Sequence, residues 1–104
     1  MSVVDSSGYM RIDHIVCPDH IADKLETEHH VTVQEAREVL LGYPRIRFAE
    51  KGHTPGEDVY VAFGQTFAGR YLAVFFVYKS VTATAIIISA RDMSKRERKA
   101  YGRK

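Results

Sequence analysis

Two long apolar segments, close together in the chain, constrain the fold more than any other feature of this sequence. They are "RYLAVFFVYK" (residues 70–79) and "ATAIIIS" (residues 83–89), and only three residues separate them. Apolar residues at successive positions are typical of strands that are buried on both faces. So short a connection can join only antiparallel neighbours. We therefore expect the two segments to form central strands of one antiparallel sheet that is covered by helices.

Three further segments are expected to complete this sheet. Residues 45–50 ("RIRFAE") and 59–65 ("VYVAFGQ") alternate apolar and polar side chains, and the runs "KGHTPGED" and "TFAG" are typical of turns. Residues 9–16 alternate in the same way before Pro18 ends the segment. The sequence thus predicts a short first strand and, later in the chain, four strands in an antiparallel meander.

Two helices are predicted between the first strand and the meander. Residues 19–30 place their apolar side chains on one side of a helix and their acids on the other. A second helix is predicted over 33–41, because Thr32 and Glu35 have the spacing of a capping box. Pro44 then prevents the helix from continuing.

A final helix is predicted near Asp92 or Ser94, since Ser94 and Glu97 form a second capping box. The order is β-α-α-β-β-β-β-α. It indicates an α+β domain with an antiparallel four- to five-stranded sheet, two N-terminal helices and one C-terminal helix.

The chain of 104 residues is expected to form a single domain, 1–104, with residues 1–8 frayed. No apolar run approaches the ~20 residues of a membrane span. The opening residues lack the pattern of a secretory signal, and a single cysteine cannot form an internal disulfide. We therefore expect a cytoplasmic protein that makes no membrane contact.

Charge is distributed unevenly along the chain, although the net charge is only +2. Residues 1–43 contain eight acidic and three basic residues, whereas residues 88–104 contain seven basic and two acidic ones. Such a basic end suits an anionic partner, either nucleic acid or an acidic protein. It also suits a solvated helix face, and charge alone leaves these alternatives open.

The motifs of several common enzyme classes are absent from this sequence. There is no Gly-rich phosphate loop and no G-x-S-x-G, so a nucleotide cradle and a serine hydrolase have no support. The five histidines fall on different predicted elements or, like His29 and His30, diverge, so we expect no metal and no cofactor. His29, beside Glu28, is the best placed to act as a general acid or base, with capping or packing as the alternative. Cys17 is expected to be a buried, inert thiol.

Basic residues gather where the last strands end. Arg70 precedes the long central strand, and Arg91 lies where the last strand meets the final helix. The final helix adds cations at i, i+3, i+4 spacing and one ring: Lys95, Arg98, Lys99 and Tyr101. Such charges suit an RNA backbone, and the ring suits stacking on a base.

A carboxylate, Glu57, is expected near this basic cluster. The alternative interpretation is purely structural. In it, Arg91 pairs with Glu57 or Glu97, and Tyr101 packs on the sheet.

The segments "GQTFAGRYLAVFFV" and "IIISARDMSKRERKAY" together resemble the BrnT family of bacterial toxins, within the broader RelE-like group. The family pattern has a Gly-Arg before a late strand, then I-S-A-R, then a helix with E-R-x-x-Y. The matching positions are Gly69-Arg70, 88–91 and 97–101. Upstream, "HHVTVQEAREVL" is similar to the family's K-H-G-V-(S/T)-x-x-E-A, and the resemblance covers roughly residues 10 to 101. Three positions differ: Glu28 replaces a lysine, His30 a glycine and Ile86 an arginine.

The resemblance implies the toxin of a type II toxin–antitoxin system, a metal-independent endoribonuclease in which the RNA's own 2′-hydroxyl is the nucleophile. It implies that His29 or Glu57 is the base. It implies that Arg70, Arg91 or Arg98 stabilises the phosphorane. It further implies that the RNA is bound by Lys95, Lys99 and Tyr101. It also implies a cognate antitoxin with a DNA-binding domain, and it allows a homodimer or a heterotetramer with that antitoxin. A non-catalytic protein that keeps the fold and binds the antitoxin or RNA remains the alternative.

Overall fold

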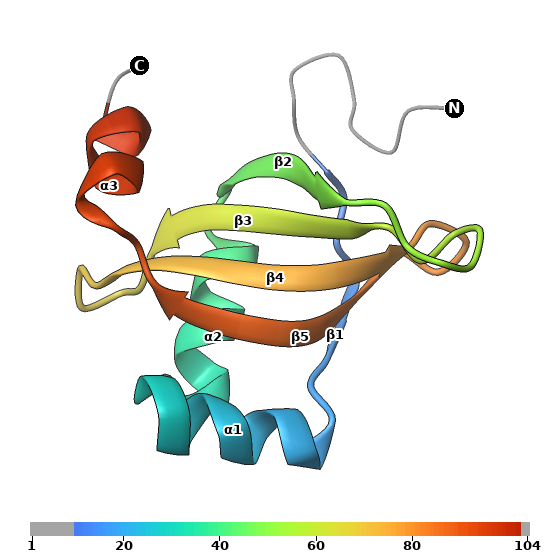
Figure 1. The fold of residues 1–104 in the computed structure, drawn as a ribbon, viewed down its shortest axis with the longest axis horizontal. Helices are drawn as coiled ribbons and strands as arrows, with labels where there is room; N and C mark the ends of the chain where they lie inside the picture. The colour runs from blue at the N-terminus through green and yellow to red at the C-terminus, as the bar shows by residue number, and fades with distance from the viewer. Residues whose placement is uncertain (1–9, 103–104) are drawn as a thin grey trace.

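A computed structural model describes residues 10–102, and within this range the chain forms five strands and three helices (Figure 1). In chain order they are β1 (His14–Val16), α1 (Asp19–His29), α2 (Val33–Leu41), β2 (Arg45–Glu50), β3 (Val59–Gln65), β4 (Tyr71–Lys79), β5 (Thr84–Asp92) and α3 (Lys95–Gly102). The expected order β-α-α-β-β-β-β-α is confirmed. The residues expected to be frayed, 1–8, lie outside the described range.

The five strands form one sheet in the order β1-β5-β4-β3-β2. Strands β2 to β5 are a meander of antiparallel neighbours, as their short connections predict. The remaining strand, β1, pairs parallel with β5, and His14 lies opposite Thr84. The sheet is therefore mostly antiparallel, with one short parallel pair at its edge.

The first strand is shorter than the pattern of residues 9–16 predicts, and it begins at His14. The residues before it are held by other contacts. The side chain of Met10 is buried in the core, and the hydroxyl of Tyr78 donates a hydrogen bond of 2.5 Å to the Arg11 carbonyl. These contacts attach the start of the described chain to β4 rather than to the backbone hydrogen bonds of β5.

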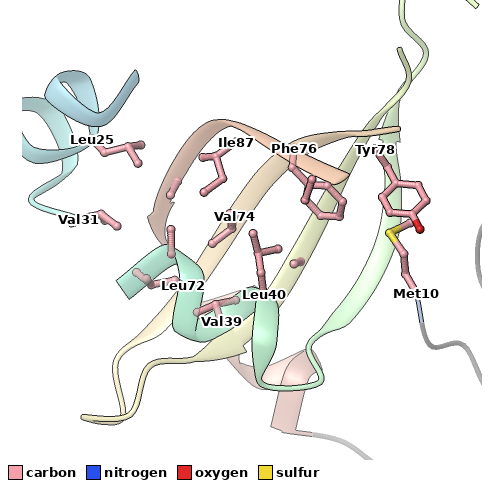
Figure 2. Close-up of a cluster of buried hydrophobic side chains, with 14 of the residues drawn as sticks. Met10, Leu25, Val31, Val39, Leu40, Leu72, Val74, Phe76, Tyr78 and Ile87 are labelled. Atoms are coloured by element: carbon pink, nitrogen blue, oxygen red, sulfur yellow. The ribbon is translucent and has the colours of Figure 1, made fainter. Parts of the chain in front are cut away.

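The core lies between one face of the sheet and the helices α1 and α2 (Figure 1). Figure 2 shows its side chains converging from both layers. The largest of those that are fully buried are Phe76, Met10, Leu25, Leu72, Ile87, Val31, Val39 and Val74. Alternate residues of β4 supply the sheet side, as the two-residue period of a strand requires. In β5 the core residues are Ala85, Ile87 and Ala90, because a register shift interrupts the alternation.

The opposite face of the sheet is open, which corrects the expectation that helices cover both faces of the central strands. In Figure 1, α2 passes behind the strands, and only α3 stands beside one end of the near side. Neighbouring side chains shield part of this face. The Arg91 guanidinium, for example, lies 5.3 Å from the centre of the Phe75 ring. Ile88, by contrast, is 39% exposed.

The helix ends follow the predicted signals. Thr32 and Glu35 form the reciprocal hydrogen bonds of a capping box at the start of α2, and Ser94 and Glu97 do the same before α3. Between α1 and α2, His30 adopts a left-handed conformation with φ of 54°. No helix among the described residues is long and apolar enough to cross a membrane.

Candidate nucleic-acid interface

Helix α3 is attached to the end of the sheet by aromatic and cationic side chains. The rings of Tyr71 and Tyr101 meet edge to face, with centroids 6.0 Å apart. The Arg98 guanidinium lies 4.1 Å from the centre of the Tyr71 ring, and that of Arg45 lies 5.9 Å from the Tyr101 ring. Both distances are within the range of cation–π attraction. We call this row of Arg98, Tyr71, Tyr101 and Arg45 the cation–aromatic ladder.

Arg98 is the cation of the ladder that is most available to an anion. Its side chain is exposed, and within residues 10–102 no carboxylate pairs with it. Arg98 also borders two surface hollows: one has Gln65, Lys99 and Tyr101 in its wall, and the other has Gly69, Arg70 and Asp92. Lys95 and Lys99, on the same helix, are exposed as well.

The positive charge of Arg91 is neutralised by a carboxylate. Its Nη1 and Nη2 donate to the two carboxylate oxygens of Glu97 at 2.6 and 2.9 Å, a bidentate geometry. The Arg91 hydrogen bonds and the Ser94 backbone N–H hold the pKa of Glu97 down, from an ordinary value of 4.5 to about 2. The structural alternative for Arg91, pairing with Glu97, is therefore confirmed, and Tyr101 does pack on the sheet through Tyr71.

Arg70 joins the helical layer to the sheet. Its guanidinium donates to the carbonyl oxygens of His29 and His30 at 3.2 and 2.7 Å. It also donates to both oxygens of Asp92, at 2.8 and 3.1 Å, and to the carboxylate of Glu35 at 3.2 Å. Every nitrogen of this guanidinium is therefore engaged within the protein. Hydrogen bonds to Arg70 lower the pKa of Asp92 and contribute to the lowered pKa of Glu35, where the Thr32 backbone N–H is the largest cause.

His29, the predicted base, is the last residue of α1 and lies at the same end of the sheet as the ladder. Its carbonyl oxygen is held by Arg70. Its imidazole adds to the lowering of the pKa of Asp92, after the larger effect of the hydrogen bond from Arg70. The structure thus brings His29, Arg70, Arg91 and Arg98 to one end of the molecule.

Glu57 lies elsewhere, and the expectation that it is near the basic cluster is wrong. It precedes β3, where its carboxylate pairs with Lys79 at 3.3 Å. Gln65, at the far end of β3, borders the hollow that contains Arg98. A strand of seven residues spans roughly 20 Å, and this length separates Glu57 from the ladder.

Sequence reasoning missed two cations of this surface, Arg45 and Arg47 on β2. They lie two residues apart, so they share a face of the sheet. That face is the open one, since Arg45 lies opposite Phe63 and Arg47 opposite Val61. The alternation in "RIRFAE" contains this signal, but the strand order that brings β2 beneath α3 is visible only in the fold.

The remaining candidates for chemistry are dispersed. Within residues 10–102, no three histidine, cysteine, aspartate or glutamate side chains come together as a metal-binding group. Cys17 is partly buried and forms no disulfide, and burial raises the pKa of its thiol. A raised pKa lowers the thiolate fraction, which agrees with the inert thiol expected there.

A sheet with helices on one face, and with exposed cations between aromatic rings at its end, defines a small α+β protein of the nucleic-acid-binding class. A family model described as "Ribonuclease toxin, BrnT, of type II toxin-antitoxin system" matches residues 19–97. The chain therefore belongs to the BrnT family of ribonuclease toxins, and it is an RNA-cleaving toxin of a type II toxin–antitoxin system. No curated protein matches the chain.

Proposed function

We propose that the chain cleaves RNA without a metal ion, at the end of the sheet where the cation–aromatic ladder meets His29. The 2′-hydroxyl next to the scissile phosphate attacks the phosphorus as it loses its proton. The bond to the 5′-oxygen breaks and that oxygen takes a proton from the acid, which leaves a cyclic 2′,3′-phosphate and a free 5′-hydroxyl. The RNA supplies its own nucleophile, so the protein must provide a base, an acid and positive charge.

The ladder is the observation that supports this proposal. Arg98 stands against Tyr71, and the nearby Asp92 is bound by Arg70, so among residues 10–102 no carboxylate pairs with the Arg98 guanidinium and it can donate to a phosphate. Tyr101 presents a ring on which a base can stack, and Lys95 and Lys99 supply charge along the backbone path. In this assignment Arg98 stabilises the phosphorane.

The other predicted residues take different roles. His29 is the base, because Glu57 lies at the far end of β3. Arg70 positions His29 by holding its carbonyl oxygen, and Arg91 fixes the start of α3 through Glu97. Their guanidinium groups are already paired with carboxylates, so they contribute to geometry more than to the charge of the transition state.

The test compares cleavage of a defined RNA by the purified full-length chain and by Arg98→Ala. Removing a preorganised donor is expected to lower the rate on the order of 10²–10³-fold. Arg96→Ala is the matched control, because Arg96 is an exposed cation of the same helix that borders none of these hollows. Equal losses in both variants would show that only the overall charge of α3 matters.

Two further measurements test which residue is the base and whether cleavage needs a metal ion. His29→Ala is expected to abolish the limb of the pH–rate profile that reports the base, while cleavage by wild type persists in EDTA. If Glu57→Gln abolishes cleavage and His29→Ala does not, the base is at the other end of the sheet. If wild type binds RNA and leaves it intact, the chain is a non-catalytic RNA-binding member of the family.

The family implies a cognate antitoxin, and we propose that this partner carries a DNA-binding domain. The cations of α3 and β2 suit an acidic segment of such a protein. Toxin and antitoxin would meet in the cytoplasm, and the toxin would form either a homodimer or a heterotetramer with the antitoxin. Light scattering of the co-expressed pair gives the stoichiometry.

A further inference from the structure

A small pocket lies between α3 and the open face of the sheet, next to the Tyr101 end of the ladder. It has a volume of about 210 Å³, and it is lined by Arg45, Arg47, Phe63, Glu97, Ala100 and Tyr101. An apolar cavity of about 150 Å³ is large enough to bind benzene. The pocket therefore has room for one planar heterocycle, and it is smaller than the 300 Å³ or more typical of sites for whole drug-sized ligands.

The lining combines rings with hydrogen-bond donors. Phe63 and Tyr101 supply flat apolar surface, and both are only partly buried. Arg47 is exposed, and within the described part of the chain no group accepts a hydrogen bond from its guanidinium. The one carboxylate, Glu97, is bound by Arg91 and by the Ser94 N–H. The pocket surface is mostly apolar, and Arg47 is a lining cation that can donate to a ligand.

We propose that this pocket binds one unstacked base of the RNA substrate and prefers guanine, which Arg47 recognises through O6 and N7. An arginine fork matches these two adjacent acceptors, whereas cytosine and adenine present a donor at the corresponding edge. Unstacked bases held between aromatic side chains are the usual targets of sequence-specific RNA recognition. The inference rests on the proposed RNA cleavage, because the ladder leads the RNA backbone to this pocket.

Binding is tested by NMR titration of the full-length chain with GMP, AMP, CMP and UMP. GMP is expected to shift the signals of Phe63, Ala100 and Tyr101 and to bind about tenfold more tightly than CMP or UMP. This value is at the lower end of the discrimination that a bidentate arginine–guanine pair provides. Equal affinity for all four nucleotides, or shifts confined to other residues, would overturn the proposal.

Arg47→Lys separates base recognition from simple charge, because lysine keeps the charge and loses the planar fork. It is expected to retain RNA affinity and to lose the preference for cleavage beside guanine, in fragments mapped on a defined RNA. Arg47 is exposed, so this variant should fold normally, which circular dichroism checks. Arg96→Lys, on α3 but outside the pocket lining, should leave the preference unchanged.

The outcomes distinguish this inference from the proposed function. If wild type cleaves RNA and Arg47→Lys leaves both rate and base preference unchanged, the base subsite is wrong and the ribonuclease stands. If wild type does not cleave but GMP shifts the pocket residues, the proposed mechanism fails and the subsite stands. If the variant loses affinity only for the antitoxin, the pocket receives a side chain of that protein and the proposal is overturned.

Discussion

His30 occupies a position whose backbone conformation favours glycine. It lies between α1 and α2 with a φ of 54°, a conformation that costs a non-glycine residue about 1–2 kcal/mol. The family pattern has glycine at this position, and the backbone angle supplies the reason. The side chain of His30 is exposed, so burial of the imidazole does not offset this cost.

His30→Gly is therefore expected to stabilise the chain. Relief of backbone strain exceeds the entropy that glycine adds to the unfolded state, so the net gain is about 0.5–1 kcal/mol. Thermal unfolding followed by circular dichroism should show Tm higher by about 2–6 °C. Glu28→Gly, two residues earlier on the exposed face of α1, is the control and should lower Tm. A fall in Tm for His30→Gly would mean that the imidazole makes a stabilising contact.

Glu97 predicts a dependence of stability on pH. Its folded-state pKa is about 2, below the ordinary value of 4.5. A carboxylate with a lowered pKa stabilises the fold fully above the unfolded pKa, and this stabilisation disappears as the pH falls from about 5 towards 2. The side chains of Glu97 and Arg91 are 24% and 38% exposed, so after solvent screening we expect a contribution of about 1–2 kcal/mol.

Urea unfolding of wild type and Glu97→Gln at pH 7 and at pH 3 measures this contribution. The two proteins should differ in free energy of unfolding at pH 7, and this difference should be clearly smaller at pH 3. A constant difference across this range would assign the effect of Glu97 to packing or to helix capping instead.

Sequence reasoning identified the cations at the strand ends and on α3 but not all of their roles, and it missed Arg45 and Arg47. Arg98 is as exposed as its helical position predicts. Arg70, by contrast, pairs with residues 22 to 41 positions away in sequence, and no local pattern reveals such partners. The role of a charged side chain depends on what surrounds it in space, and the sequence determines those neighbours only through the complete fold.

At the scale of elements, the helix ends were the most predictable features. Capping boxes act over three residues, so Thr32 and Ser94 could be recognised directly. The first strand was less predictable. Its length depends on β5, which lies some 70 residues away, and on the insertion of Met10 into the core.

The junction of α1 and α2 depends on Arg70. Replacing Arg70 with alanine leaves the carbonyls of His29 and His30 without this donor, and it leaves two carboxylates close together. Hydrogen bonds to charged groups contribute about 1.5–3 kcal/mol, so Arg70→Ala should lose about 2–3 kcal/mol of unfolding free energy. Arg70→Lys keeps the charge without the fork and should lose less. Urea unfolding tests the order, and equal losses in both variants would show that the fork geometry is needed.

The attachment of α3 depends on the ladder. No residue of α3 is buried, so losing a ring contact should weaken the packing of α3 and leave the rest of the fold unchanged. Tyr71→Leu removes the ring between Arg98 and Tyr101, and amide exchange in α3 is expected to become faster while exchange in β4 and β5 stays slow. Unchanged protection of α3 would mean that the Arg91–Glu97 pair is sufficient to hold it.

For the whole molecule, composition and patterning predicted the fold class but not which face of the sheet is covered. The runs in β4 and β5 are apolar at nearly every position, so periodicity could not distinguish one helical layer from two. The placement of α1 and α2 on the same side settles this question. It leaves Ile87 fully buried and its neighbour Ile88 39% exposed.

This difference gives a direct test of the open face. Ile87→Ala should cost about 2–5 kcal/mol, because it leaves a cavity in the core. Ile88→Ala should cost less than about 1 kcal/mol, since water already reaches its side chain. Urea unfolding of the two variants measures both values. Equal costs would show that a partner or a second copy covers the open face.

The parallel pairing of β1 with β5 sets an order of events during synthesis. The N-terminal segment and both first helices emerge from the ribosome long before the strands on which they pack. His14 reaches its partner Thr84 only after about 70 further residues have been made. The ladder needs Tyr101, which is made after all five strands. The cationic surface therefore forms last, on a sheet whose strands have already been synthesised.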